Sequence, residues 1–414
     1  MSRVLVVEDS RTFSSLLSRR ITEEMGHQVV VADSMAKAAG ILATDADFFV
    51  ALLDLNLPDA PKGEVVDLVL ARGIPSIVFT GEMDDELRDK FWAKRIVDYI
   101  LKQNMDNVAY MLSLVERLHR NPGIKVLVVD DSQSARYVVG ELLRAHRYQV
   151  LEAEDGRTAL AMLAQHPDTR LIICDYNMPG MDGSELVRTI RRDRAKDQLA
   201  IIGLSGTDGV GLTAKFIKNG ANDFLHKPFL TEEFYTRVTQ NIELLEYIAQ
   251  IKELAEKDYL TRLYNRRYVF SAGPKLMAAQ TRRGQGVVLA MLDIDHFKHI
   301  NDTHGHDAGD AVLRQMSALL AARFRVSDIV SRFGGEEFCV LATDMNAADA
   351  GGVFEDLRQA FESSPVSFGG QSIRYTVSIG LCTSPLGGLE DMIKAADDAL
   401  YVSKNDGRNR VTVA

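Results

Sequence analysis

Acidic residues, a hydroxyl residue and a lysine recur in the same order in two parts of the sequence. The first set is Glu8, Asp9, Asp54, Thr80 and Lys102, and the second is Asp130, Asp131, Asp175, Ser205 and Lys227. Three converging carboxylates repel one another unless a hard divalent cation lies among them, and Mg²⁺ prefers oxygen ligands. An aspartate beside such a cation and a lysine can attack a phosphoryl group and form an acyl phosphate. We therefore expect two phosphoryl-accepting sites.

A different set of chemical groups lies in the last part of the sequence. It comprises Asp293 and Asp295 after an apolar run, then Lys298, Asn301 and Asp310, then Glu336 and Glu337 after Gly334-Gly335, and finally Lys404 and Arg408. Carboxylates at a metal, an amide that can read a base and basic groups for phosphate oxygens together suit a nucleoside triphosphate. Taken singly, a Gly-Gly-Glu-Glu sequence is more often a plain hairpin turn, and a terminal basic run is more often solvated surface.

The elements that position the repeated groups form a repeat themselves. The matched residues are 121 to 125 positions apart, and apolar runs such as 4–7 and 126–129 precede the acids. Helix-period segments at 11–25 and 134–145 separate these runs. Strands that alternate with helices predict a doubly wound parallel sheet, in which ligands collect at the carboxyl ends of the strands. We therefore expect two α/β domains, at residues 1–120 and 121–230.

The segment 231–257 predicts one long helix, because it contains neither glycine nor proline. Its start, Thr231-Glu232-Glu233, resembles a helix cap. Spacings of four, three and four residues relate Leu244, Ile248, Ile251 and Ala255, a pattern typical of a short coiled-coil seam. For the first half, a core helix of the preceding domain and a connector are equally acceptable interpretations. From Leu244 onward, a protruding connector, and with it a dimer stalk, is the favoured interpretation.

Residues 258–414 have no counterpart in the first two domains. Apolar runs at 287–292, 338–341 and 375–379, separated by helical stretches, predict an α+β domain. The length of 414 residues agrees with three domains of ordinary size.

Composition excludes several classes of protein. With 46% hydrophobic residues the chain can bury sizeable cores, and its formal net charge of −10 argues against a general nucleic-acid binder. No uninterrupted apolar run exceeds six residues, so we expect neither a membrane span nor a signal peptide. The three scattered cysteines favour a reducing, cytoplasmic location.

Residues 1–230 resemble two receiver domains of two-component response regulators. The resemblance implies a flavodoxin-like fold and makes Asp54 and Asp175 the phosphoacceptors. It assigns the paired acids to Mg²⁺, with the carbonyls of Asn56 and Asn177 completing the metal shell. It places Tyr99 and Phe224, three residues before each lysine, at the switch-aromatic position, and it implies a histidine kinase or phosphotransfer protein as phosphodonor. Both copies keep every chemical group, so which one is phosphorylated stays open.

Residues 258–414 resemble the GGDEF domain of diguanylate cyclases, a nucleotidyl-cyclase-like fold, in its GGEEF variant. The motif at 258–267, the acids after 287–292 and the Gly334-Gly335 turn carry the resemblance. It implies that Asp293, the Ile294 carbonyl and Glu336 bind Mg²⁺ or Mn²⁺, with Glu337 at a second metal and as a candidate general base. It assigns Asn301 and Asp310 to guanine, Lys298, Lys404 and Arg408 to phosphates, and Phe297 and the glycine turn to the pocket wall. It makes Arg325 and Asp328 an inhibitory site for the cyclic product, with Arg358 as a further arginine.

The order of the domains resembles PleD-type response regulators. That resemblance implies a homodimer that converts two GTP molecules into cyclic di-GMP under the control of receiver phosphorylation. A non-catalytic receptor for GTP or cyclic di-GMP is an alternative, although degenerate receptors typically lose residues equivalent to Asp293, Glu336 and Glu337, which are all present. A DNA-binding regulator is a second alternative, but the sequence contains no basic recognition helix.

Overall fold

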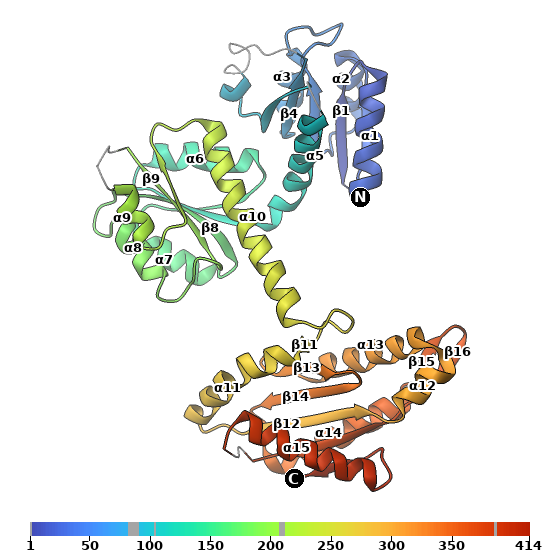
Figure 1. The fold of residues 1–414 in the computed structure, drawn as a ribbon. Coiled ribbons are helices and arrows are strands. Elements are labelled where there is room, and N and C mark those ends of the chain that lie inside the picture. Colours follow the sequence, from blue (N-terminus) through green and yellow to red (C-terminus); the bar gives the residue numbers. More distant parts are fainter. Residues whose placement is uncertain (1, 82–90, 103–104, 207–211, 385–386) are drawn as a thin grey trace. The chain divides into compact units, whose positions relative to one another are not determined.

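A computed structural model describes residues 2–81, 91–102, 105–206, 212–384 and 387–414 (Figure 1). Its contacts divide the chain into two compact units, Met1–Ile248 and Ala249–Ala414. The first unit contains both halves of the sequence repeat, and the second contains the domain with the GGEEF sequence.

The first half of the first unit is a five-stranded parallel sheet in the order β2-β1-β3-β4-β5. Its strands are β1 (Arg3–Val7), β2 (Gln28–Ala32), β3 (Val50–Asp54), β4 (Ser76–Thr80) and β5 (Asp98–Leu101). The described helices around it are α1 (Arg11–Met25), α2 (Met35–Thr44), α3 (Glu64–Leu70) and α5 (Met105–Arg120). The central strands β1, β3 and β4 are apolar and buried because helices cover both faces of the sheet.

The second half repeats this arrangement after a short 3₁₀ turn, η1 (Asn121–Gly123). Its sheet has the order β10-β9-β8-β6-β7, which is the same topology. The strands are β6 (Lys125–Val129), β7 (Gln149–Ala153), β8 (Thr169–Asp175), β9 (Ala200–Ser205) and β10 (Asp223–His226). The described helices are α6 (Gln133–Ala145), α7 (Gly156–Gln165), α8 (Gly183–Ile190), α9 (Leu212–Lys218) and the first half of α10 (Thr231–Glu256). The prediction of two doubly wound, flavodoxin-like domains is confirmed.

Helix α10 changes character along its length. Phe234, Tyr235, Val238, Ile242 and Leu245 are buried in the core of the second α/β domain. The first half of the predicted connector is therefore packed as a core helix.

Beyond this core, large apolar side chains of α10 face solvent. Leu244, Tyr247, Ile251 and Leu254 are 51%, 59%, 65% and 75% exposed, at spacings of three, four and three residues. We call these four residues the α10 stripe. Leu244 and Ile251 belong to the seam expected from the sequence, whereas Ile248 is half-buried.

The second unit is built on a six-stranded mixed sheet in the order β11-β13-β14-β12-β17-β18. These strands are β11 (Tyr264–Asn265), β13 (Ile329–Gly334), β14 (Glu337–Thr343), β12 (Val287–Ile294), β17 (Val377–Cys382) and β18 (Val411–Val413). A separate hairpin pairs β15 (Val366–Phe368) with β16 (Gln371–Ile373). The helices are α11 (Arg266–Arg283), α12 (Phe297–His304), α13 (His306–Arg323), α14 (Ala347–Ser363) and α15 (Leu389–Asn405).

Strand β12 is antiparallel to both of its neighbours, β14 and β17, and all eight of its residues are buried. Helices α11 and α15 supply side chains to the core on one face, and α13 and α14 supply them to the core on the other. The expected α+β domain is confirmed. Across the described ranges, we find no helix with the length and hydropathy that a membrane crossing requires.

Candidate functional site

The first α/β domain gathers its acids where the strands end. Glu8, directly after β1, is 1% exposed, and Asp54 ends β3 and is 3% exposed. The Lys102 Nζ lies 2.6 Å from Glu8 Oε2 and 2.7 Å from Asp54 Oδ2. Oxygens of Glu8, Asp9 and Asp54 lie within 4.8 Å of one another. Burial raises the pKa of Glu8, and this crowding of carboxylates fits a divalent cation held by oxygen ligands.

The second α/β domain repeats the contacts between the lysine and two carboxylates. The Lys227 Nζ lies 2.6 Å from Asp130 Oδ2 and 2.6 Å from Asp175 Oδ1. Burial raises the pKa of Asp175. Although burial opposes the charge of Lys227, hydrogen bonds to the two carboxylates raise its pKa, so the lysine is held as a cation. The exposed Asp131 is next to Asp130 in sequence, at the same carboxyl edge of the sheet.

The other predicted receiver residues lie around these acids. Thr80 and Ser205 end β4 and β9 and are 3% and 0% exposed. Tyr99 in β5 is half-buried, and Phe224 in β10 is 6% exposed and packs against Phe216. Asn56 and Asn177 donate backbone N–H groups to Asp54 and Asp175, at 3.1 and 2.8 Å. Their roles as carbonyl ligands stay predictions.

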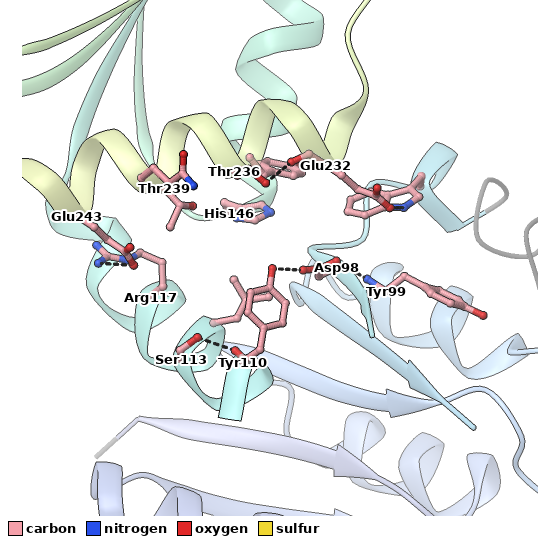
Figure 2. Close-up of a pocket in the computed structure, with 14 residues that line it drawn as sticks. Asp98, Tyr99, Tyr110, Ser113, Arg117, His146, Glu232, Thr236, Thr239 and Glu243 are labelled. Carbon is pink, nitrogen blue, oxygen red and sulfur yellow. Dashed lines mark hydrogen bonds and ion pairs between the residues drawn. The ribbon is translucent and has the colours of Figure 1, made fainter. Parts of the chain in front are cut away.

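A cavity of about 510 Å³ lies where the two receiver folds meet (Figure 2). Residues of β5 and α5 line one side of it, and residues of α10 line the other. The Tyr110 hydroxyl donates to Asp98 Oδ2 at 2.6 Å. Burial, with a smaller contribution from the charge of Glu232, raises the pKa of Asp98 to about 6, although the hydrogen bond from Tyr110 opposes this shift.

The same interface contains polar contacts from the first receiver to α10. Arg117 donates to both carboxylate oxygens of Glu246, at 2.8 Å each. The Trp92 indole donates to Glu232 Oε1 at 3.2 Å. His146 of the second domain stacks on Tyr235 of α10, with centroids 3.6 Å apart, and its Nε2 lies 3.0 Å from the Val97 carbonyl oxygen of the first domain. No pattern in the sequence predicts this interface, because its residues come from elements that share no common periodicity.

In the second unit, the acid at the end of β12 lies opposite the GGEEF sequence. Asp293 is 6% exposed, pairs in register with Glu337 of β14, and its Oδ2 lies 2.8 Å from Lys404 Nζ. Burial raises the pKa of Asp293 to about 6; Lys404 opposes this shift, and the charges of Glu336 and Glu337 add to it. Carboxylates that disfavour one another's charge fit a divalent cation at this point. The adjacent Ile294 is the last residue of β12, and its role as a carbonyl ligand stays a prediction.

The glycine turn joins β13 to β14 as expected. Gly335 has a φ of +46°, which glycine adopts without strain. Arg332 donates through Nε to the Gly335 carbonyl at 2.8 Å and through Nη1 to Asp258 Oδ1 at 3.1 Å. Asp258 lies two residues after α10, so one arginine connects the entrance of the domain to the GGEEF turn. Sequence reasoning gave Arg332 no role.

The predicted base-reading residues come from two consecutive helices. Asn301 lies in α12, and Asp310 lies in α13 and forms an ion pair with Arg314 at 3.7 Å. A Cβ on Gly309 would lie 2.0 Å from Asn301 Oδ1 and 3.2 Å from the Phe297 ring. The absence of a side chain at Gly309 therefore lets the two helices approach each other here, which the sequence analysis missed.

The predicted basic residues differ in their surroundings. Lys298 is exposed near the start of α12, and Arg408 is exposed in the loop that follows α15. Lys404 is held at Asp293, as described above.

The predicted inhibitory residues fall into two groups. Asp328 is 7% exposed and accepts hydrogen bonds from the Arg325 N–H at 2.9 Å and from the N–H and hydroxyl of Thr343, at 2.9 Å each. The Arg325 side chain is exposed. Arg358 instead bonds Glu355, Glu362 and Asn409. The structure thus brings Arg325 and Asp328 together and gives Arg358 separate partners.

Comparison with known proteins covers both kinds of domain. Residues 255–410 match the family described as diguanylate cyclase, GGDEF domain, and residues 126–239 match the response regulator receiver domain. Diguanylate cyclase A of Treponema denticola is 34% identical over 44% of this chain and 52% of its own length. A solved structure described as a two-component system response regulator/GGDEF domain protein is 42% identical, with a TM-score of 0.54 over 59% of this chain and 100% of its own.

The similarity to one relative extends over nearly the whole chain. The response regulator PleD of Caulobacter vibrioides is 30% identical over 99% of this chain and 98% of its own length. Because that match spans both α/β domains as well as the GGDEF domain, the chain belongs to the PleD family of response regulators with a diguanylate cyclase output domain.

Proposed function

We propose that this chain joins two GTP molecules into cyclic di-GMP and pyrophosphate, as a homodimer switched on by receiver phosphorylation. The observation that carries the proposal is the cluster at the end of β12. There Asp293 lies opposite Glu337, within 2.8 Å of Lys404, at the base of the GGEEF turn. A strand that ends in such a cluster can hold a triphosphate and a divalent cation together.

In this proposal each residue has one task. Asp293, the Ile294 carbonyl and Glu336 hold Mg²⁺ or Mn²⁺, which polarises the α-phosphate when bound. Asn301 and Asp310 face the donors of the guanine edge, which adenine lacks. Lys298, Lys404 and Arg408 bind triphosphate oxygens, and Phe297 and the Gly334-Gly335 turn shape the pocket.

The reaction consists of two successive displacements at phosphorus. The 3′-oxygen of one GTP attacks the α-phosphorus of the other, and the bond to pyrophosphate breaks. The 3′-hydroxyl proton leaves to a base, for which Glu337 is our candidate. A second, reciprocal attack closes the ring.

The reaction requires two domains, because each domain holds one GTP. The α10 stripe supports association of two copies through this helix, since four large apolar side chains at heptad spacing lie exposed. Phosphorylation would act by favouring the encounter of two loaded domains.

The two acid sites support phosphorylation of the receivers, at Asp54, at Asp175 or at both. In each, a buried aspartate lies within 2.7 Å of a lysine that can neutralise the incoming phosphoryl oxygens. The exposed Arg325 beside the ordered Asp328 supports a product-binding site that limits synthesis, and a role for Arg358 there stays a prediction.

Incubation of the purified chain with GTP and Mg²⁺, followed by chromatography of the products, tests the proposal. We expect cyclic di-GMP, more of it with beryllofluoride, and at least ~100-fold less with Glu336→Ala or Asp293→Asn. Asp356→Asn, which neutralises an exposed acid on α14, is the matched control and should keep full activity.

Three further measurements test the proposed regulation and the alternative of a non-catalytic receptor. We expect the gain with beryllofluoride to disappear when Asp54 and Asp175 are both replaced by asparagine. Added cyclic di-GMP should slow the wild type and spare Arg325→Ala. Binding of GTP with no cyclic product, even with beryllofluoride, would instead identify a receptor.

A further inference from the structure

The loop between α15 and β18 holds two consecutive non-glycine residues in the left-handed backbone region. Arg408 has a φ of +62° and Asn409 of +45°, and Gly407 before them has a φ of +111°. This backbone is unfavourable for arginine and persists where neighbouring groups hold it in place. Because the proposed function assigns Arg408 to the triphosphate, whatever fixes this loop also fixes the position of that guanidinium.

Asp295 fixes the loop from the side of the sheet. Its side chain is 4% exposed, and its Oδ2 accepts the Asn409 N–H at 3.0 Å and the Thr376 hydroxyl at 2.8 Å. Its Oδ1 accepts the Ser378 hydroxyl at 2.6 Å. Both oxygens are therefore engaged by the protein, although Asp293, two residues earlier, is a proposed metal ligand.

Helix α14 holds the same residue from the other side. Arg358 Nη1 donates to Asn409 Oδ1 at 2.5 Å, and Asn409 Nδ2 donates to Glu362 Oε1 at 3.1 Å. Arg358 is itself oriented by Glu355 and Glu362, at 2.7 and 2.8 Å. Asn409 is thus held through its backbone by Asp295 and through its side chain by α14.

We infer that Asp295 is a positioning residue for the reaction: it anchors Asn409 and thereby places Arg408 for the triphosphate. The inference rests on the proposed role of Arg408. On this inference the two acids of the Asp293-Ile294-Asp295 sequence have different roles. Asp293 binds the metal beside the nucleotide, and Asp295 holds the loop that carries the phosphate-binding Arg408.

Two substitutions of Asp295 distinguish positioning from metal binding. Asp295→Ala removes the acceptor of the Asn409 N–H, so we expect the KM for GTP to rise about tenfold with kcat within about threefold of wild type. Asp295→Asn should restore a KM within about threefold, because the amide oxygen can accept the N–H while the amide nitrogen donates to Ser378. A metal ligand would instead make Asp295→Asn as damaging as Asp295→Ala and raise the Mg²⁺ concentration needed for half-maximal activity.

A second variant guards against misfolding of Asp295→Ala. Asn409→Pro removes the same N–H together with the side-chain contacts to α14, and is incompatible with a positive φ, while the buried acid stays in place. We expect it to reproduce the rise in KM. Thr376→Val, which removes another hydrogen bond of Asp295 without touching the loop, is the matched control and should leave the KM within about threefold.

Direct binding gives a readout that catalysis does not influence. With a GTP analogue that lacks the 3′-hydroxyl, Asp295→Ala and Asn409→Pro should each weaken binding about tenfold, whereas GMP binding should stay unchanged because it has no β- and γ-phosphates. If Arg408→Ala leaves binding of the analogue unchanged, the proposed role of Arg408 is wrong, and the inference with it. If Arg408→Ala weakens binding but Asp295→Ala and Asn409→Pro do not, only the positioning role of Asp295 is wrong.

Discussion

Among single residues, Asp98 most directly links proton concentration to the stability of the first unit. Its folded-state pKa of about 6 exceeds the ordinary value of 3.8 because the carboxyl is buried near Glu232. The stabilising contribution of this group is therefore complete below about pH 4 and is lost as the pH rises through about 6. We expect Asp98→Asn, which mimics the protonated form, to raise the unfolding free energy at pH 7.5 by about 3 kcal/mol.

Thermal unfolding at pH 5 and at pH 7.5 checks this expectation. The advantage of Asp98→Asn over wild type should shrink at the lower pH. Asp223, the equivalent residue of the second receiver, pairs with Arg237 at 3.2 Å. Asp223→Asn should therefore lower stability slightly instead of raising it. An advantage of Asp98→Asn that is equal at both pH values would contradict the pKa argument.

For Gly309→Ala we expect weaker binding of GTP without a loss of stability. Alanine is a better helix former than glycine by about 1 kcal/mol, so Gly309→Ala should not lower Tm. The added Cβ would lie 2.0 Å from Asn301 Oδ1 and would displace that amide. We expect the KM for GTP to rise roughly five- to tenfold, because the substitution removes one hydrogen bond to the base.

The control for Gly309 is available in the same domain. Gly351 lies in α14, and a Cβ there meets no atom within 4 Å. Gly351→Ala should therefore raise Tm and leave the KM unaltered. Equal KM values for both variants would show that Gly309 does not position Asn301.

The sequence predicts single residues well where one strand or turn presents them and poorly where separate elements meet. The acids at the ends of β1 and β3, and of β6 and β8, follow apolar runs of one sheet each, so the edge that each pair shares could be foreseen, as could the acid at the end of β12. Arg332 and Asp295 act through contacts with residues 74 and 81 positions away in the sequence. Gly309 acts through the absence of a side chain beside Asn301, eight positions away. No local periodicity records such contacts.

Helix α10 is the element on which dimer formation depends in our proposal. We expect replacement of Ile251 and Leu254 by serine to raise the dimer dissociation constant at least ~100-fold, since each buried aliphatic side chain contributes about 1.5–3 kcal/mol. Sedimentation as a function of concentration measures this change, and cyclase activity should become correspondingly more dependent on concentration.

Gln250→Ser, at an exposed polar position of the same helix, is the matched control and should leave the dissociation constant within about threefold. If the Ile251 and Leu254 variant also associates as the wild type does, the stripe is not the contact between copies.

The length and continuity of α10 were predictable, because no glycine or proline interrupts it. The sequence favours an exposed connector from Leu244 onward, but for the first half it does not decide between a core helix and a connector, because apolar residues at helical spacing occur in both halves. Only tertiary contacts, such as those of Phe234 and Leu245 with the receiver core, decide between the two interpretations.

At the scale of the whole molecule, the contact of Arg117 with Glu246 offers a route from the first receiver to α10. The guanidinium is 9% exposed and bonds Glu246 through two nitrogens at 2.8 Å. If phosphorylation at Asp54 acts through this contact, Arg117→Gln should reduce activation by beryllofluoride at least about fivefold and leave basal synthesis unchanged. The measurement belongs in an Asp175→Asn background, where only the first receiver can respond.

A control substitution on α5 and the Asp54→Asn background test whether the effect of Arg117→Gln is specific to the first receiver. Arg120 lies one turn further along α5, is 52% exposed and pairs with Glu116 of its own helix, so Arg120→Gln should not alter activation. In an Asp54→Asn background, where only the second receiver responds, Arg117→Gln should also have no effect, because α10 already belongs to that receiver's core. Equal losses in both backgrounds would mean that Arg117 supports the fold in general. A loss confined to the Asp175→Asn background would show that the first receiver acts on the cyclase through the helix that the second receiver holds.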